Sequence, residues 1–160
     1  MGLIKTRLNQ AAKAELVTHQ AYRKLRRQAL PDLSGLQTLI ERADLEDSRH
    51  YEQILADLER LNKHTDADPA PVTPIFEPMY IPDSVPEILD RLRQVELSLI
   101  RAYKQICTLS LDLDYRVFDL AFRNLQDNSI HLSTIDRMLA AVGAPATQAT
   151  TGLEAGQDGP

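Results

Sequence analysis

The sequence has little of what marks several common classes of protein. Cys107 is its only cysteine, which excludes an internal disulfide and fits a reducing cytoplasm. No apolar stretch approaches the ~20 residues of a membrane span, and the N-terminus has no apolar segment typical of a secretory signal. Basic residues are outnumbered, and the net charge of -5 argues against nucleic acid as the main partner. These absences predict a cytoplasmic protein with no membrane or nucleic-acid partner.

What the sequence does contain is typical of one soluble globular domain. Hydrophobic residues make up 43% of the 160 residues and charged residues 26%. Four long segments show the apolar periodicity of helices. We expect helices over about 4–29, from a cap at Asp32 or Ser34 to about 63, over 85–109, and from the break at 112–114 to 143.

The connections between these segments predict the topology. The segment from Thr65 to Ser84 holds five prolines, together with apolar residues that favour an extended strap laid along the protein. These apolar residues are Ile75, Phe76, Met79 and Tyr80. Short, long and short connections predict an all-α, antiparallel four-helix bundle with a long crossover between helices two and three. We expect residues 1–145 to form this bundle and residues 146–160, which are small and polar, to be a disordered tail.

Each expected helix has a stripe facing the bundle axis, apolar toward its ends and polar at mid-length. Unpaired ionisable groups in a core cost several kcal/mol each, so such a belt needs mutual pairing, water or a metal ion. The polar members of the four stripes are Glu15, Thr18, Tyr22, Asp47, His50, Glu96, Tyr103, Asn124, Asn128 and His131.

Four pairs within this belt are separated by the same 81 residues. The pairs are Glu15 with Glu96, Tyr22 with Tyr103, Asp47 with Asn128, and His50 with His131. Taken singly, buried histidines and tyrosines are more often hydrogen-bonded core residues, but the shared offset favours a common role. The two helical hairpins are therefore predicted to be copies related by a pseudo-twofold axis.

The spacing within each copy suggests metal chemistry. Asp47 and His50, at positions i and i+3 of a helix, point the same way and can hold one cation, with carboxylates from facing helices completing its shell. Carboxylate oxygen with imidazole nitrogen suits iron, manganese or zinc rather than calcium. Two such half-sites facing each other would make a dinuclear centre.

At this point the chain resembles the ferritin-like superfamily, and bacterioferritins most closely, over roughly residues 4–142. The resemblance rests on two matching pairs, Glu15-x6-Tyr22 and Glu96-x6-Tyr103. It also rests on residues 46–50, which end in His50, on residues 127–132, which contain His131, and on the strap. In that family two glutamates and two Glu-x-x-His motifs bind a di-iron ferroxidase centre. The resemblance implies that Glu15, His50, Glu96 and His131 are terminal ligands, that Asp47 and Asn128 are bridges, and that Tyr22 and Tyr103 support them.

The sequence departs from the family pattern at both bridging positions. Asp47 is one methylene shorter than glutamate, and Asn128 removes one of four carboxylates, so we expect a weakened, asymmetric or mononuclear iron site, or none. Glu46 and Asp127, each four residues before a histidine, are candidate substitute ligands nearer the flank. Ser48 stands where haem-binding bacterioferritins have methionine, so no haem is predicted.

Three functions remain open at this stage. The first is a bacterioferritin-like protein that oxidises Fe(II) for iron storage or detoxification as a homo-oligomer, with the apolar residues of the strap at an interface. The second is a ferritin-like subunit whose degenerate site leaves it a structural or regulatory partner. The third is a small di-metal oxidase acting on an organic substrate.

Overall fold

The computed structural model describes residues 2–27, 35–63 and 84–143, and this part of the chain consists of four long helices without a strand. The helices are α1 (Gly2–Arg26), α2 (Leu36–Lys63), α3 (Val85–Ser110) and α4 (Tyr115–Gly143). The all-α prediction is therefore confirmed. None of these helices combines the length and the apolar character of a membrane span.

The end of α1 differs from the prediction. It ends at Arg26 instead of Ala29, because the backbone N–H of Arg27 turns back to the carbonyl oxygen of Lys24 at 3.1 Å and closes the last turn. The predicted caps Asp32 and Ser34, residues 65–83 of the strap and the C-terminal tail lie outside the described residues.

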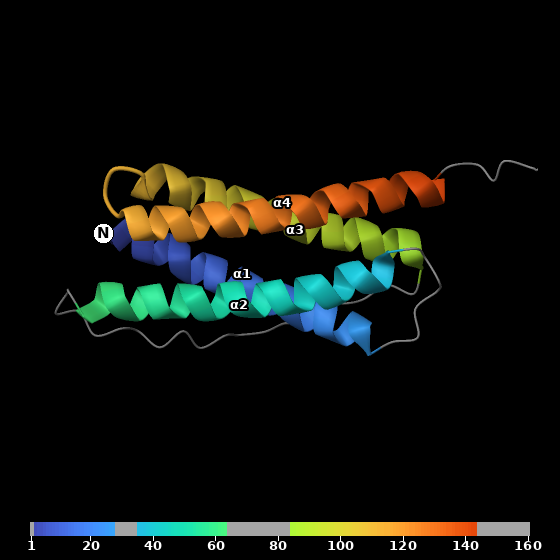
Figure 1. Cartoon of the computed structure of the whole chain (residues 1–160), viewed down its shortest axis with the longest axis horizontal. Coiled ribbons are helices and arrows are strands. Elements are labelled where there is room, and N and C mark those ends of the chain that lie inside the picture. The colour runs from blue at the N-terminus through green and yellow to red at the C-terminus, as the bar shows by residue number, and fades with distance from the viewer. Residues whose placement is uncertain (1, 28–34, 64–83, 144–160) are drawn as a thin grey trace, which may run out of the picture.

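The helices form two antiparallel hairpins, α1 with α2 and α3 with α4 (Figure 1). Helix α2 ends and α3 begins at opposite ends of the bundle, so these two helices run parallel (Figure 1). This is the crossover topology that the connection lengths predict. Contacts between α1 and α3 and between α2 and α4 join the two hairpins.

Local chemistry sets the starts of three helices. Ser84 caps α3 by accepting a hydrogen bond from the backbone N–H of Glu87, and a proline occupies the first turn, as predicted. Asp114 does the same for α4, with its Oδ1 accepting from the backbone N–H of Val117 at 3.2 Å. Gly35 precedes α2 with a φ of 85°, and a Cβ there would lie 3.2 Å from the Met138 methyl carbon, so both the backbone conformation and the space favour glycine.

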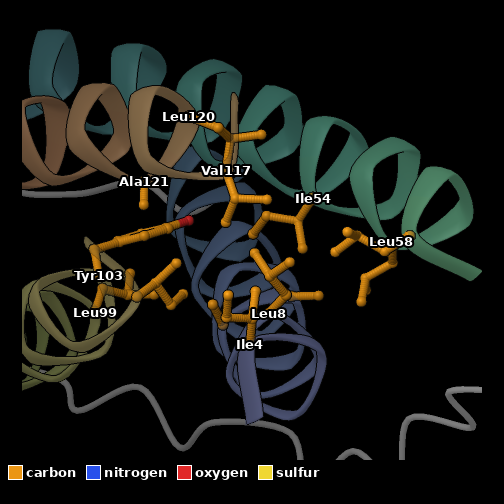
Figure 2. Packing of buried hydrophobic residues seen from close by; sticks show 13 residues of the cluster. Ile4, Leu8, Ile54, Leu58, Leu99, Tyr103, Val117, Leu120 and Ala121 are labelled. Carbon is orange, nitrogen blue, oxygen red and sulfur yellow. The ribbon is translucent and has the colours of Figure 1, made fainter. Parts of the chain in front are cut away.

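The apolar core is divided into two clusters, one toward each end of the bundle. Figure 2 shows the first, where Ile4 and Leu8 of α1 meet Ile54 of α2 and Val117 of α4. The second contains Leu25, Ile40, Leu89 and Ile135 among others. Every residue that the sequence assigns to the interior stripes is buried, except Val85 and Val142 at helix ends, which are half-buried. The stretch between the clusters holds the polar belt.

Candidate metal centre

The polar belt lies at mid-length in all four helices and is closed to solvent. Its six predicted metal ligands have no exposed surface, although each is charged or strongly polar. They are Glu15, Asp47, His50, Glu96, Asn128 and His131. The belt lies between the two apolar clusters of the core.

One half of the belt brings three metal-ligand side chains to a common point. Glu15 of α1 and Asp47 and His50 of α2 each offer a ligand atom, and these atoms all lie within 4.8 Å of one another. The Nδ1 atom of His50 is 3.2 Å from Glu15 Oε1. Within the described residues this is the one such group found among acidic, histidine and cysteine side chains.

Several polar atoms of the belt have no hydrogen-bond partner among the described protein atoms. Both carboxylate oxygens of Asp47 are in this state, as are Oε2 of Glu15 and Oε2 of Glu96. Buried polar atoms are normally paired, because an unpaired one loses its hydration without compensation. Two carboxylates and an imidazole with oxygens left free are a donor set that suits a divalent ion such as iron, manganese or zinc. The residues present therefore fit the metal that the resemblance implies.

The second half of the belt is arranged differently. Asn128 occupies the place equivalent to Asp47, and both its side-chain Nδ2 and Oδ1 also lack partners. The Nδ1 atom of His131 is 3.4 Å from Glu96 Oε1, close enough for ionic attraction but without hydrogen-bond alignment. Because a carboxamide is neutral, this half supplies one negative charge fewer than the half around Asp47.

The two buried tyrosines link the two halves of the belt, because each donates a hydrogen bond to a glutamate of the other hairpin. Tyr22 of α1 donates its hydroxyl hydrogen to Glu96 Oε1 of α3 at 2.7 Å. Tyr103 of α3 donates in the same way to Glu15 Oε1 of α1. Burial first, and then the neighbouring glutamates, raises the pKa of both tyrosines well above the usual value. Both hydroxyls therefore stay protonated and act as donors that fix the glutamates.

The side chains of Glu46 and Asp127 also form contacts between the two hairpins, and the sequence did not predict these contacts. Asp127 Oδ2 lies 3.1 Å from His50 Nε2, and Glu46 Oε2 lies 2.7 Å from His131 Nε2. Each acid is thus paired with the histidine of the other hairpin, on the ring nitrogen that faces away from the belt. A carboxylate in that position orients a metal-binding imidazole and raises its basicity. The substitute-ligand role remains a prediction.

The ionisation of the belt follows from this geometry. Burial, reinforced by Glu15 and Glu96, raises the pKa of the Asp47 carboxyl well above its ordinary value. Burial would lower the pKa of His131, but Glu96 and Glu46 outweigh it and raise that pKa. Protons and a cation therefore compete for the Asp47 carboxyl group, which makes metal affinity dependent on pH.

Sequence reasoning placed some residues in the belt without finding their partners. Asn124 donates to the Tyr103 hydroxyl at 3.1 Å and so joins the chain that ends at Glu15. Arg49 forms an ion pair with Asp127 Oδ2 at 2.9 Å, and Arg42 forms an ion pair with Glu46 Oε1 at 2.9 Å. Only the last of these pairs has a sequence signal, the i,i+4 spacing of opposite charges on one helix.

Comparisons with known proteins agree with this architecture. A family described as the ferritin-like domain matches residues 5–142. Among curated proteins, the chain is 28% identical over 138 residues to the "DNA protection during starvation protein" of Pyrococcus furiosus, an alignment that covers 82% of this chain and 74% of that protein. Since the family match spans all four helices, the chain belongs to the ferritin-like family.

Proposed function

We propose that the chain binds Fe(II) at Glu15, Asp47 and His50 and oxidises it for iron storage or detoxification, in the manner of a bacterioferritin. The observation that carries the proposal is the Asp47 carboxylate, buried between Glu15 and His50 with both oxygens unpaired. Glu96, Asn128 and His131 form a second, weaker position, because Asn128 contributes no charge. The function is a ferroxidase reaction with an asymmetric centre.

Each part of the belt has a role in this function. Bound iron supplies the redox chemistry, giving up one electron per ion to an oxidant. Glu15 and Asp47 neutralise its charge, and Tyr103 and Asp127 hold Glu15 and His50 in place. The apolar clusters on either side of the belt exclude water from the site.

The relative from Pyrococcus furiosus is named for DNA protection. For this chain we propose protection by removal of Fe(II) and oxidant, without DNA binding. Its net charge is -5, and acidic residues outnumber basic ones by 23 to 18, which disfavours a polyanion as a partner. The cytoplasm remains the proposed compartment.

Self-association is part of the proposal, with a second copy of the chain as the partner. Tyr115, Phe118 and Phe122 form a stacked aromatic row on α4, with ring centroids 6.3 Å and 5.9 Å apart. Tyr115 is 75% exposed and Phe122 is 43% exposed. The row is flanked by the ion pair of Asp119 and Arg123. If two α4 helices pack antiparallel about a twofold axis at the level of Ala121, Arg123 of each copy faces Asp119 of the other, and the surface is then self-complementary.

Anaerobic titration with Fe(II) tests the metal site. We expect saturable binding to the wild type and its loss in Glu15→Gln. The matched control is Glu96→Gln, at the pseudo-equivalent position, which should keep the stronger site. Equal retention of Fe(II) binding and oxidation in both variants would show that Glu15 is not a ligand.

A ferritin-like subunit with a degenerate site is the second candidate. Asn128 favours it, as do the contacts that occupy both nitrogens of His50 with acids. This candidate predicts that protein loaded with Fe(II) under air retains no iron after gel filtration. The ferroxidase proposal predicts retained iron and an Fe(III) absorbance that grows with loading.

A further inference from the structure

A polar pocket lies between α2 and α4, where the two hairpins meet. Its volume is about 270 Å³, whereas one water molecule occupies about 30 Å³ in the liquid, so a small ligand fits there together with bound water. Helix α2 supplies two of its residues and α4 supplies the others. We call it the polar pocket, and it is lined by Arg49, Gln53, Arg123, Asn124, Gln126 and Asp127.

The polar pocket is separate from the candidate metal centre. Asp127 Oδ2 contacts His50 Nε2 at 3.1 Å, and Asn124 Nδ2 donates to the Tyr103 hydroxyl at 3.1 Å. These contacts close the side of the pocket that faces the belt, because Asn124 is only 2% exposed and both His50 and Tyr103 are fully buried. A ligand of the pocket is therefore held outside the metal site, and the inference goes beyond the proposed function.

The polar pocket has an excess of hydrogen-bond donors. Arg49 uses its Nη2 atom, toward Asp127 at 2.9 Å, and Arg123 uses Nε and Nη2, both toward one residue of its own helix. Within the described ranges, the other guanidinium N–H groups have no protein partner, and neither do the side-chain amides of Gln53 and Gln126. Since a guanidinium group cannot accept a hydrogen bond, these donors require a ligand with acceptor atoms.

The charge of the lining favours an anion. Arg49 and Arg123 are positive, and Asp127 is the one acidic residue of the lining. Its Oδ2 atom is shared between Arg49 at 2.9 Å and His50 at 3.1 Å, so this carboxylate does not serve Arg49 alone. The partner of Arg123 is Asp119, which lies outside the lining and is 47% exposed, so solvent screens that pair. The lining thus keeps positive charge that an anion can neutralise.

The internal duplication provides a comparison within the same chain. The equivalent place, 81 residues away at each position, has one arginine instead of two and no carboxamide. That arginine, Arg42, donates its Nε hydrogen to Glu46 Oε1 at 2.9 Å. The donor-rich lining is therefore a property of one half of the bundle and not of the duplicated scaffold. The equivalent residues are Ile130, Thr134, Arg42, Ala43, Leu45 and Glu46.

We propose that the polar pocket binds a tetrahedral oxyanion, of the phosphate or sulfate type, between Arg49 of α2 and Arg123 of α4. Guanidinium groups pair with such oxyanions through parallel, charge-assisted hydrogen bonds. A tetrahedral oxyanion directs its oxygens to several sides, so it accepts from both helices and from the amides at once, whereas a planar carboxylate directs its oxygens to one side. Because the ion binds only the folded chain, it stabilises the contact between the hairpins.

Calorimetric titration of the full chain with inorganic phosphate, without added metal and at constant ionic strength, tests the proposal. We expect saturable binding to the wild type. Arg123→Gln should weaken it about 10–100-fold, because a charge-assisted hydrogen bond is lost. Arg42→Gln, at the pseudo-equivalent position, is the control and should bind as the wild type does. Equal weakening in the two variants, or no saturable binding to the wild type, would overturn the proposal.

A second pair of variants leaves the charge unchanged. Gln53→Leu removes a donor from the pocket, and Thr134→Leu is its control at an equally half-buried position. Phosphate should bind severalfold more weakly to Gln53→Leu alone; equal affinities would mean that the ion responds to positive charge in general and not to the pocket. In ¹⁵N-labelled wild type, phosphate should shift the side-chain amide signals of Gln53 and Gln126, and signals that stay in place would contradict the site.

Other anions test the shape and the source of the ligand. Sulfate should compete with phosphate, and acetate should bind much more weakly; acetate binding as tight as that of phosphate would contradict a tetrahedral site. Glycerol 3-phosphate distinguishes the two sources of phosphate, since tighter binding than inorganic phosphate identifies an ester and equal binding identifies the free ion. Phosphate should also raise the unfolding temperature of the wild type but not of Arg123→Gln, and an equal rise in both would reject the bridge between the hairpins.

Discussion

At the scale of single residues, the difference between Asp47 and Asn128 decides what the site can bind. Both side chains are fully buried at mid-helix, and neither has a hydrogen-bond partner among the described residues. A metal-bound carboxylate there is stable because the cation compensates for its lost hydration. The carboxamide of Asn128 is a weaker ligand, so the two halves of the bundle should bind metal with different strength.

Asn128→Asp should therefore restore a second Fe(II) per chain in an anaerobic titration. The same change should destabilise the metal-free protein by about 1–3 kcal/mol, because a buried carboxyl group without a partner is costlier to desolvate than the carboxamide that it replaces. Urea denaturation with and without Fe(II) measures both effects. Unchanged iron stoichiometry would mean that the second half is not a ligand set.

Removal of one tyrosine hydroxyl gives a matched comparison. Tyr103→Phe should weaken metal binding by about 10–100-fold, the usual effect of losing a group that orients a ligand, because Tyr103 holds Glu15. Tyr22→Phe should have a smaller effect on the stronger site, since Tyr22 holds Glu96. Titration of both variants with Fe(II) measures the difference, and equal weakening would contradict the asymmetry of the centre.

The sequence predicted which residues enter the belt but not all of their partners. Periodicity places Glu15, His50 and Asn124 on interior stripes because it reports only which face of a helix is buried. It does not report which helices pack side by side or how far each is shifted along its neighbour. For that reason the contact of Asp127 with the other hairpin's His50 could not be derived, although both residues were candidates.

At the scale of elements, the start of α4 depends on one side chain. Asp114 caps the helix and accepts a hydrogen bond from Arg60 of α2 at 2.8 Å, and Arg60 also bonds to the buried Asp57. Sequence reasoning predicted the break at 112–114, but the link to α2 required the structure. Asp114 therefore joins the two hairpins at this end of the bundle.

Asp114→Ala should lower the free energy of unfolding by about 1 kcal/mol from the cap alone. Burial would raise the pKa of Asp114, but the bonds from Arg60 and from backbone N–H groups outweigh it and lower that pKa. This stabilisation is complete above the pKa of the unfolded chain and disappears as the pH falls through the lower folded value. Denaturation at neutral and strongly acidic pH should show the variant and the wild type converging in acid. Asp112→Ala, at an exposed neighbour, is the control.

At the scale of the whole molecule, the aromatic row of Tyr115, Phe118 and Phe122 is the proposed contact with another copy of the chain. Phe122→Ser should lower the mass of the assembly measured by light scattering after gel filtration, because it removes apolar area from the contact. Leu45→Ser is the control, since Leu45 is 73% exposed on α2 and lies outside the row. An unchanged mass in Phe122→Ser would place the interface elsewhere.

The central claim is that the α1–α2 hairpin brings Glu15, Asp47 and His50 together to hold a metal ion. Anomalous X-ray diffraction from crystals grown with Fe(II) under anaerobic conditions tests it most directly. The account predicts a strong iron peak bound by these three side chains and a weaker one, or none, beside Asn128. Iron peaks confined to surface carboxylates, with the belt free of metal, would contradict it.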